Sequence, residues 1–147
     1  MYRKLAVVTA AVAMLLGGTA ASAVATPAAP AVEASATTTI PNVVDVTPTN
    51  TSQVMQWSYT KPVVLDFTAT WCYWCQKQKP YLQQYNTADN GAWVWAKVDV
   101  DRNRDLYNKY RVRGIPALLN IQNGQEAGSR LVGFDGPTSL RNWLNNL

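Results

Sequence analysis

The chain has 147 residues, enough for one domain and a leader, and 48% of them are hydrophobic, which is enough for a real core. Its formal charge of +4 includes Arg3 and Lys4 at the N-terminus. Without those two bases the excess falls to +2, which is too weak to indicate a nucleic-acid-binding protein. The chain has two cysteines and no histidine. Because a zinc site takes about four ligands, usually Cys or His, we expect no metal, and nothing indicates another cofactor.

Residues 1–23 have the pattern of an export signal. A basic start at Arg3 and Lys4 precedes an apolar run at 5–16, and Ala21-Ser-Ala23 fits the cleavage pattern of small residues. A retained membrane anchor is the alternative, since the uncharged run is nearly long enough to span a bilayer. Residues 24–40 are rich in Ala, Thr and Pro and have no periodicity, so they are predicted to be a disordered linker.

The remaining residues, 41–147, are predicted to form one α/β domain. Apolar periodicity and turn residues predict strands at 43–46, 62–67, 93–100, 117–121 and 129–134, and helices at 51–57, 76–86, 103–110 and 137–147. In this order, the elements predict a central mixed sheet with helices on both faces. The last two strands should form a hairpin through Asn123-Gly124, a strong turn signal.

Cys72 and Cys75 lie between a predicted buried strand and a predicted helix. A thiol at a helix N-terminus is exposed to the positive end of the helix dipole, which favours the thiolate. We therefore expect Cys72 to be the reactive, partly exposed thiol and Cys75 to be shielded one turn further on. A purely structural disulfide is the alternative, but so short a loop would stabilise the fold little.

The chain resembles the thioredoxin family from about residue 43 to 147. The resemblance rests on motifs in register: Asp66-Phe67-x-Ala69-x-Trp71-Cys72-x-x-Cys75, Pro80, Ala96-Lys97-Val98-Asp99, Gly114-Ile115-Pro116, Asn123-Gly124 and Val132-Gly133. It implies the thioredoxin fold, dithiol chemistry without a cofactor, and a cis-proline at Pro116. One departure is Tyr73-Trp74 between the cysteines, where cytosolic members usually have Gly-Pro. With the leader, this dipeptide looks more like the extracytoplasmic thioredoxin-like proteins.

The predicted catalytic residues are Cys72, Cys75, Asp66 and Lys97. Cys72 would attack a disulfide and Cys75 would resolve the mixed disulfide. Asp66 lies in an apolar strand, so desolvation should raise its pKa and suit it as a general base; a structural buried acid is the alternative. Lys97 could pair with Asp66 across adjacent strands, or be an exposed strand lysine.

The predicted substrate-binding residues are Trp71, Tyr73, Trp74, Ile115, Pro116 and Gly133. Trp71 could equally be a core residue, whereas Trp74 should be exposed. The proline loop and Gly133 would line a groove for an extended peptide, which suits a protein substrate.

The prediction is an exported, monomeric thiol-disulfide oxidoreductase acting on protein thiols and disulfides, with a membrane redox partner as one candidate electron source. A redox-inert peptide-binding module is the alternative. A separate cluster of bases, at Arg102, Arg104, Lys109, Arg111 and Arg113, is interpreted as a solvated face, with an acidic partner as the lesser alternative.

Overall fold

The computed structural model describes residues 39–147. The elements are, in chain order, β1 (Val43–Asp45), α1 (Thr51–Trp57), β2 (Val63–Thr68), α2 (Tyr73–Ala88), β3 (Val94–Asp99), α3 (Arg104–Lys109), β4 (Ala117–Gln122), β5 (Gln125–Val132) and α4 (Pro137–Leu144). None of the helices in this described part is long and apolar enough to cross a bilayer. The predicted export signal and almost all of the predicted linker lie outside the described residues and stay predictions.

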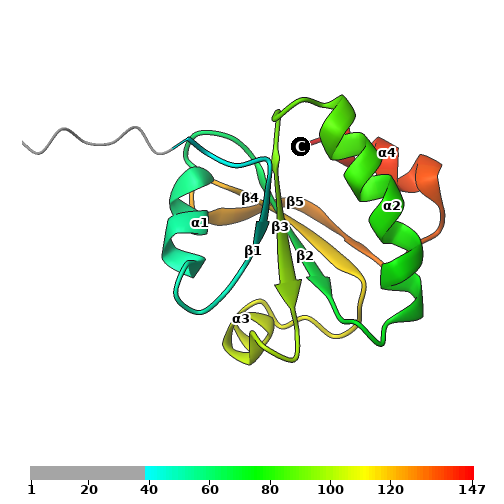
Figure 1. Cartoon of the computed structure of the whole chain (residues 1–147), viewed down its shortest axis with the longest axis horizontal. Coiled ribbons are helices and arrows are strands. Elements are labelled where there is room, and N and C mark those ends of the chain that lie inside the picture. The colour runs from blue at the N-terminus through cyan, green and yellow to red at the C-terminus, as the bar shows by residue number, and fades with distance from the viewer. Residues whose placement is uncertain (1–38) are drawn as a thin grey trace, which may run out of the picture. The chain divides into compact units, whose positions relative to one another are not determined.

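The five strands form one mixed sheet in the order β1-β3-β2-β4-β5 (Figure 1). Strands β1 and β2 run parallel to β3, whereas β4 runs antiparallel to β2 and to β5. β2 lies at the centre because nearly all of its side chains are apolar and both of its faces are covered. Asp66 is the one charged residue in this buried strand, and it is 5% exposed.

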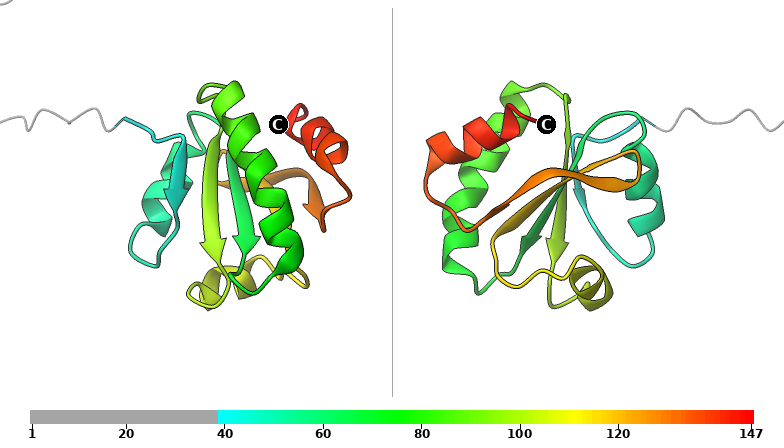
Figure 2. Two further views of the ribbon diagram at one scale, coloured as in Figure 1. Left: turned by 45° about the vertical axis from the view of Figure 1, so that its right-hand side comes forward. Right: turned by 180° about the vertical axis from the view of Figure 1, so that it is seen from behind.

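Two apolar layers enclose the sheet. On one face, Leu65 and Phe67 of β2 pack in a cluster with Val54 of α1 and Leu106 of α3. On the other face, side chains of the sheet pack with Leu82 of α2 and with α4. Figure 2 shows α2 and α4 on one side of the sheet and α1 on the opposite side. The predicted α/β class, element order and mixed sheet are therefore confirmed.

The boundaries differ from the prediction where side chains or turns shift them. α2 begins at Tyr73, three residues earlier than predicted, because the Cys72 sulfur accepts a hydrogen bond from the backbone N–H of Cys75 and caps the helix. The helix continues through Pro80. β5 begins at Gln125, because the turn at Asn123-Gly124 has positive φ at both residues and returns the chain directly into pairing.

The buried side of α2 contains a polar group that sequence periodicity did not flag. Gln78 is 1% exposed, and neither its amide nitrogen nor its amide oxygen has a hydrogen-bond partner among the described residues. An unpaired buried polar group costs about 1–3 kcal/mol of desolvation. Gln78 therefore lowers the stability of the domain.

We predict that Gln78→Leu raises the free energy of unfolding by about 1–3 kcal/mol, because leucine fills a similar volume without a desolvation penalty. Urea denaturation of the oxidised protein measures the change. Gln84→Leu, at an exposed position of the same helix, is the control and should change stability by less than about 0.5 kcal/mol. A destabilised Gln78→Leu variant would contradict the prediction.

Candidate active site

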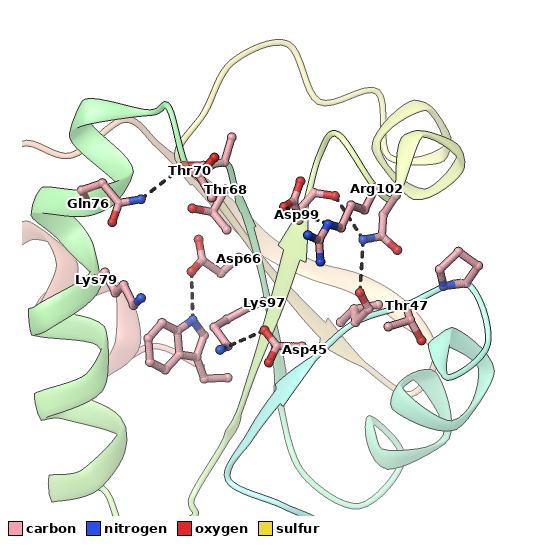
Figure 3. Close-up of a pocket in the computed structure, with 15 residues that line it drawn as sticks. Asp45, Thr47, Asp66, Thr68, Thr70, Gln76, Lys79, Lys97, Asp99 and Arg102 are labelled. Atoms are coloured by element: carbon pink, nitrogen blue, oxygen red, sulfur yellow. Dashed lines mark hydrogen bonds and ion pairs between the residues drawn. The ribbon is translucent and has the colours of Figure 1, made fainter.

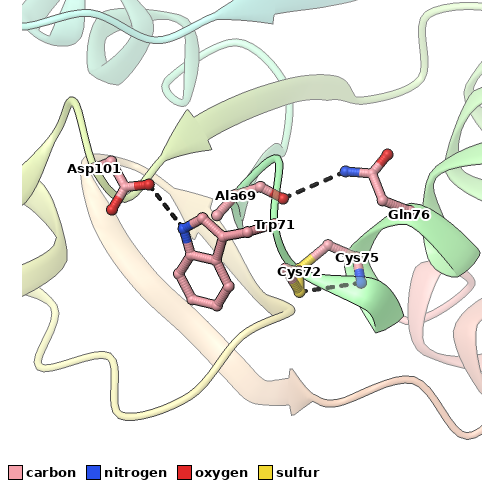
Figure 4. The surroundings of a disulfide bond; sticks show 6 residues. All are labelled: Ala69, Trp71, Cys72, Cys75, Gln76 and Asp101. Carbon is pink, nitrogen blue, oxygen red and sulfur yellow. Dashed lines mark hydrogen bonds between the residues drawn. A yellow bond between two sulfur atoms is a disulfide. The ribbon is translucent and has the colours of Figure 1, made fainter.

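The two cysteines form a disulfide at the N-terminus of α2 (Figure 4). Cys72 is the N-cap residue and has extended backbone angles, while Cys75 lies in the first helical turn, with 5.3 Å between the two Cα atoms. The backbone N–H of Cys75 donates to Cys72 Sγ at 3.2 Å. This N–H is one of the donors that a helix terminus leaves free, so it is placed to stabilise negative charge on Cys72 sulfur once the disulfide is reduced.

The burial of the cysteines differs from the expectation. Cys72 was expected to be partly exposed and Cys75 to be shielded, but in the disulfide form they are 5% and 4% exposed. Both residues pack against the apolar cluster that includes Ala69 and Phe67. The two thiols are therefore distinguished by their place on the helix, at the N-cap and one turn on, and not by exposure in this state.

Three exposed aromatic residues surround the disulfide. Trp71, Tyr73 and Trp74 are 68%, 62% and 56% exposed, so the core-packing alternative for Trp71 is wrong. The Trp71 indole N–H donates to Asp101 Oδ2 at 2.9 Å, which fixes the ring on the surface (Figure 4). Tyr73 and Trp74 pack edge to face, with 5.1 Å between ring centroids. An apolar surface of this kind is typical of a protein-binding site.

The loop before β4 contains the predicted cis-proline. The Ile115–Pro116 peptide bond is cis, as expected. The backbone N–H of Gly133 donates to the Pro116 carbonyl at 2.8 Å, so the structure brings these two predicted groove residues together. Gly133 has a φ of +81° and open space where a Cβ would stand, and neighbouring Val132 is 59% exposed. Ile115 is half-buried and packs on the core.

Asp66 is the buried acid that the sequence predicted. Burial raises the pKa of its carboxyl from 3.8 to about 6, partly opposed by the Trp95 indole and by the charges of Lys97 and Lys79. The Trp95 indole N–H donates to Asp66 Oδ2 at 2.9 Å (Figure 3). Asp66 therefore gains or loses its proton close to neutral pH, which suits a group that exchanges a proton in a reaction.

The predicted pairing of Lys97 with Asp66 is wrong. The two residues are register partners on β3 and β2, but the Lys97 ammonium forms its ion pair with Asp45 of β1, at 2.9 Å (Figure 3). Lys97 is also the register partner of Asp45 on β1. Its two neighbours across the sheet, Asp45 and Asp66, are therefore both carboxylates. The Lys97 side chain is 27% exposed and that of Asp45, on edge strand β1, is 79% exposed, so this ion pair leaves the ammonium better hydrated than a pair with the buried Asp66 would.

Sequence reasoning missed Trp95 and Asp45 as neighbours of the site. Trp95 lies two residues before Lys97 on the same strand, and side chains two apart in a strand point to the same face, so the strand period could have flagged it. Asp45 could not have been found this way, because the pairing of β1 with β3 joins segments about 50 residues apart. The pairing of β1 with β3 depends on the tertiary fold.

A cavity of about 350 Å³ adjoins the Asp66 carboxyl. Its lining includes Lys97 and Asp45 on one side and Gln76 and Lys79 of α2 on the other (Figure 3). Gln76 directly follows Cys75, and its side-chain amide donates to the Ala69 carbonyl at 3.3 Å. The cavity therefore extends from the buried acid to the first turn of the helix that holds the disulfide.

No three Cys, His, Asp or Glu side chains among residues 39–147 are arranged to hold a metal ion. The described site consists of a disulfide, a buried carboxyl group and an aromatic surface. A reduced Cys72 thiolate at this helix terminus can attack another disulfide.

The thioredoxin family model matches residues 42–146 of the chain. The chain belongs to the thioredoxin family. The match covers the sheet, all four helices and the disulfide, so the sequence resemblance and the predicted thioredoxin fold are confirmed.

Individual thioredoxins are similar over a shorter stretch. Thioredoxin from Rickettsia bellii is 31% identical over 85 residues, covering 58% of this chain and 80% of that protein. Mitochondrial thioredoxin from Mus musculus is 37% identical over 86 residues, covering 51% of its length, and the bifunctional thioredoxin reductase/thioredoxin from Mycobacterium leprae is 34% identical over 90 residues, covering 19% of its length. The chain thus spans about half of the first of these two proteins and about a fifth of the second. A mutant thioredoxin from Halobacterium salinarum superposes with a TM-score of 0.61 at 25% identity, covering 71% of this chain and 89% of that one.

We predict that the buried acid makes this protein less stable as pH rises from about 4 to above 6. The folded state binds the Asp66 proton more tightly than the unfolded state does, so stability is highest below pH 3.8 with respect to this group and falls until the folded pKa of about 6 is passed. A shift of about two units corresponds to about 3 kcal/mol. Asp66→Asn, measured by urea denaturation across this range, should remove the loss and be more stable at pH 7; an unchanged pH slope would contradict it.

We predict that Asp45→Asn lowers the pKa of Asp66, because the Lys97 ammonium loses its partner and can turn toward the buried carboxyl. A carbon-13 NMR titration of the Asp66 carboxyl measures the change. The control is the same substitution in a Lys97→Met background, where the pKa should not respond. An equal fall in both backgrounds would mean that Asp45 acts on Asp66 directly and not through Lys97.

Proposed function

We propose that this thioredoxin-family protein is a thiol-disulfide oxidoreductase that exchanges disulfides with protein substrates. The observation that carries the proposal is the Cys72–Cys75 disulfide, which lies at the N-terminus of α2 among exposed aromatic side chains. A structural disulfide would be expected to join segments that are distant in the chain. This one closes a four-residue loop at a helix terminus, where thiolates are stabilised.

In the reducing direction, the Cys72 thiolate attacks one sulfur of a substrate disulfide. A mixed disulfide forms and the second substrate sulfur leaves as a thiolate. Cys75 then loses its proton, attacks Cys72 Sγ, and displaces the first substrate sulfur as a thiolate, which takes up a proton from solvent. Two electrons pass to the substrate and the Cys72–Cys75 disulfide re-forms. The same steps in reverse oxidise a substrate dithiol.

Asp66 is proposed as the base that accepts the Cys75 proton. Its pKa of about 6 allows it to be unprotonated at neutral pH and still to return a proton to solvent. Lys97 is proposed to act through its charge, since it is held by Asp45 and makes no ion pair with Asp66. The cavity beside Asp66 is also lined by Gln76, the residue after Cys75, and a water molecule in it is proposed to take the proton from the buried carboxyl to solvent.

Trp71, Tyr73 and Trp74 are proposed to contact the substrate, together with the loop at Ile115-Pro116 and with Gly133. The open space at Gly133 leaves room for an extended chain to approach the loop backbone and to pair with it by hydrogen bonds. Protein substrates fit such a surface better than small thiols do. We propose that the protein acts as a monomer. We also propose that it is exported, because residues 1–23 have the pattern of an export signal. A membrane redox partner is one candidate electron source.

We predict that Cys75→Ala accumulates mixed disulfides with client proteins, because the nucleophile remains and the resolving thiol is lost. The adducts would be seen on a non-reducing gel and would disappear with dithiothreitol. Cys72→Ala is the matched control and should trap nothing. Equal trapping by both variants would contradict the roles assigned to the two thiols.

Reduction of insulin with dithiothreitol as electron donor tests the activity itself. The wild-type protein should accelerate the reduction, and Cys72→Ala should not. Absence of acceleration, with peptide binding retained, would instead support the redox-inert binding module. The reduction potential, measured against glutathione, then decides whether the protein oxidises or reduces its clients in an oxidising compartment.

A further inference from the structure

A second pocket is lined by Trp71, the residue directly before Cys72, and shares no lining residue with the cavity beside Asp66. It has a volume of about 420 Å³ and is lined by residues of α3, of the loop before Pro116 and of the segment before Cys72. Trp71 forms an aromatic wall, and Ile115 belongs to the cis-proline loop. A polypeptide that crosses the disulfide would therefore place a neighbouring side chain at this pocket.

Two arginines line the pocket from different elements. Arg104 begins α3 and Arg113 lies in the loop before Pro116. Both are exposed, and neither has an ion pair or hydrogen-bond partner among the described residues. The pocket also contains the Asp101 carboxylate, but Asp101 accepts the Trp71 indole hydrogen bond. Its net charge is positive, with two guanidinium groups against one carboxylate.

The other basic residues near α3 are differently placed. Arg102 faces Asp99 at 3.9 Å, and the Lys109 ammonium lies over the Tyr110 ring at 5.5 Å. Among the five bases of the predicted cluster, the unpartnered guanidinium groups within residues 39–147 are those of Arg104, Arg111 and Arg113. These three flank the cis-proline loop.

Arg111 extends the positive surface past that loop. Arg111 and Arg113 both line a neighbouring pocket of about 350 Å³ that also includes Val132. Arg111 has a φ of +49°, a left-handed conformation that glycine and asparagine adopt at lower cost. The other non-glycine residues with positive φ in the described chain are both asparagines. An arginine at such a strained position points to a role for its side chain.

We propose that Arg104, Arg111 and Arg113 bind acidic side chains on either side of a client's reactive cysteine, so that the protein prefers clients with acidic flanking sequences. This inference rests on the proposed function and names its substrate class. Guanidinium groups bind carboxylates through paired hydrogen bonds. The Trp71 ring in the same pocket would contact apolar groups of the client chain. The positive field also raises the rate of encounter with acidic chains, and salt weakens it.

Three disulfide-linked peptide substrates of equal length test the preference. They carry Glu, Gln or Lys on both sides of one cysteine, and stopped-flow Trp fluorescence follows their reaction with the reduced full-length protein. The second-order rate constant should be largest for the Glu peptide, intermediate for the Gln peptide and smallest for the Lys peptide. Two exposed charge pairs predict a Glu-to-Gln ratio of about two- to thirtyfold at low salt. The ratio should fall toward one at about 0.5 M NaCl.

Substitutions locate the preference. The Glu-to-Gln ratio should fall close to one in the Arg104→Gln/Arg113→Gln double variant, and Arg104→Glu/Arg113→Glu should favour the Lys peptide. Arg102→Gln is the matched control, since it removes a charge of the same cluster outside this pocket. An equal loss of preference in Arg102→Gln, or a ratio unchanged in the double variants, would overturn the proposal.

The peptide reaction rates also distinguish failure of the proposed function from failure of the acidic preference. In that case the wild-type protein would react with none of the three peptides, whatever their charge, and both proposals would fall. Reaction with all three at the same rate and at all salt concentrations would leave the oxidoreductase in place and overturn only the acidic preference.

Discussion

The carboxyl group of Asp66 lies inside the central strand of the sheet, and much of the site is arranged around this buried acid. Burial disfavours the charged form of this carboxyl and so raises its pKa to about 6. The Trp95 indole donates one hydrogen bond to the carboxyl, and Asp45 holds the Lys97 ammonium toward edge strand β1. With a fully neutralising partner at Asp66 the domain would be more stable, but the carboxyl would stay ionised and could not readily exchange a proton.

The disulfide depends on the same strand for its position. β2 ends at Thr68, and the short turn that follows places Cys72 at the N-cap of α2. The sulfur of Cys72 accepts the backbone N–H of Cys75 at the helix N-cap, whereas Cys75 lies one turn further on. This gives the two sulfurs different chemistry although their exposure is almost the same. A site built on a strand and a helix terminus holds its geometry better than one on loops alone.

The surface around the disulfide combines apolar and positively charged groups. Trp71, Tyr73 and Trp74 supply large exposed rings, and the arginines near the cis-proline loop supply charge. Apolar rings give contact area with little sequence preference, whereas charge discriminates among substrates and affects encounter rates. A surface of this composition fits the proposed preference for some protein substrates over others.

The sequence by itself determined the element order, the dithiol and the buried acid, because these follow from local patterns. The apolar run around Asp66 predicts a buried strand, and Cys72 and Cys75 lie between it and a helix within one short segment. The cis-proline also follows from a motif whose residues are contiguous. The partner of Lys97, the exposure of Trp71 and the convergence of Arg104 and Arg113 on one pocket were decided by the tertiary structure alone. They depend on strand pairing and helix packing between residues far apart in the chain, and no local pattern encodes which side chains such packing brings together.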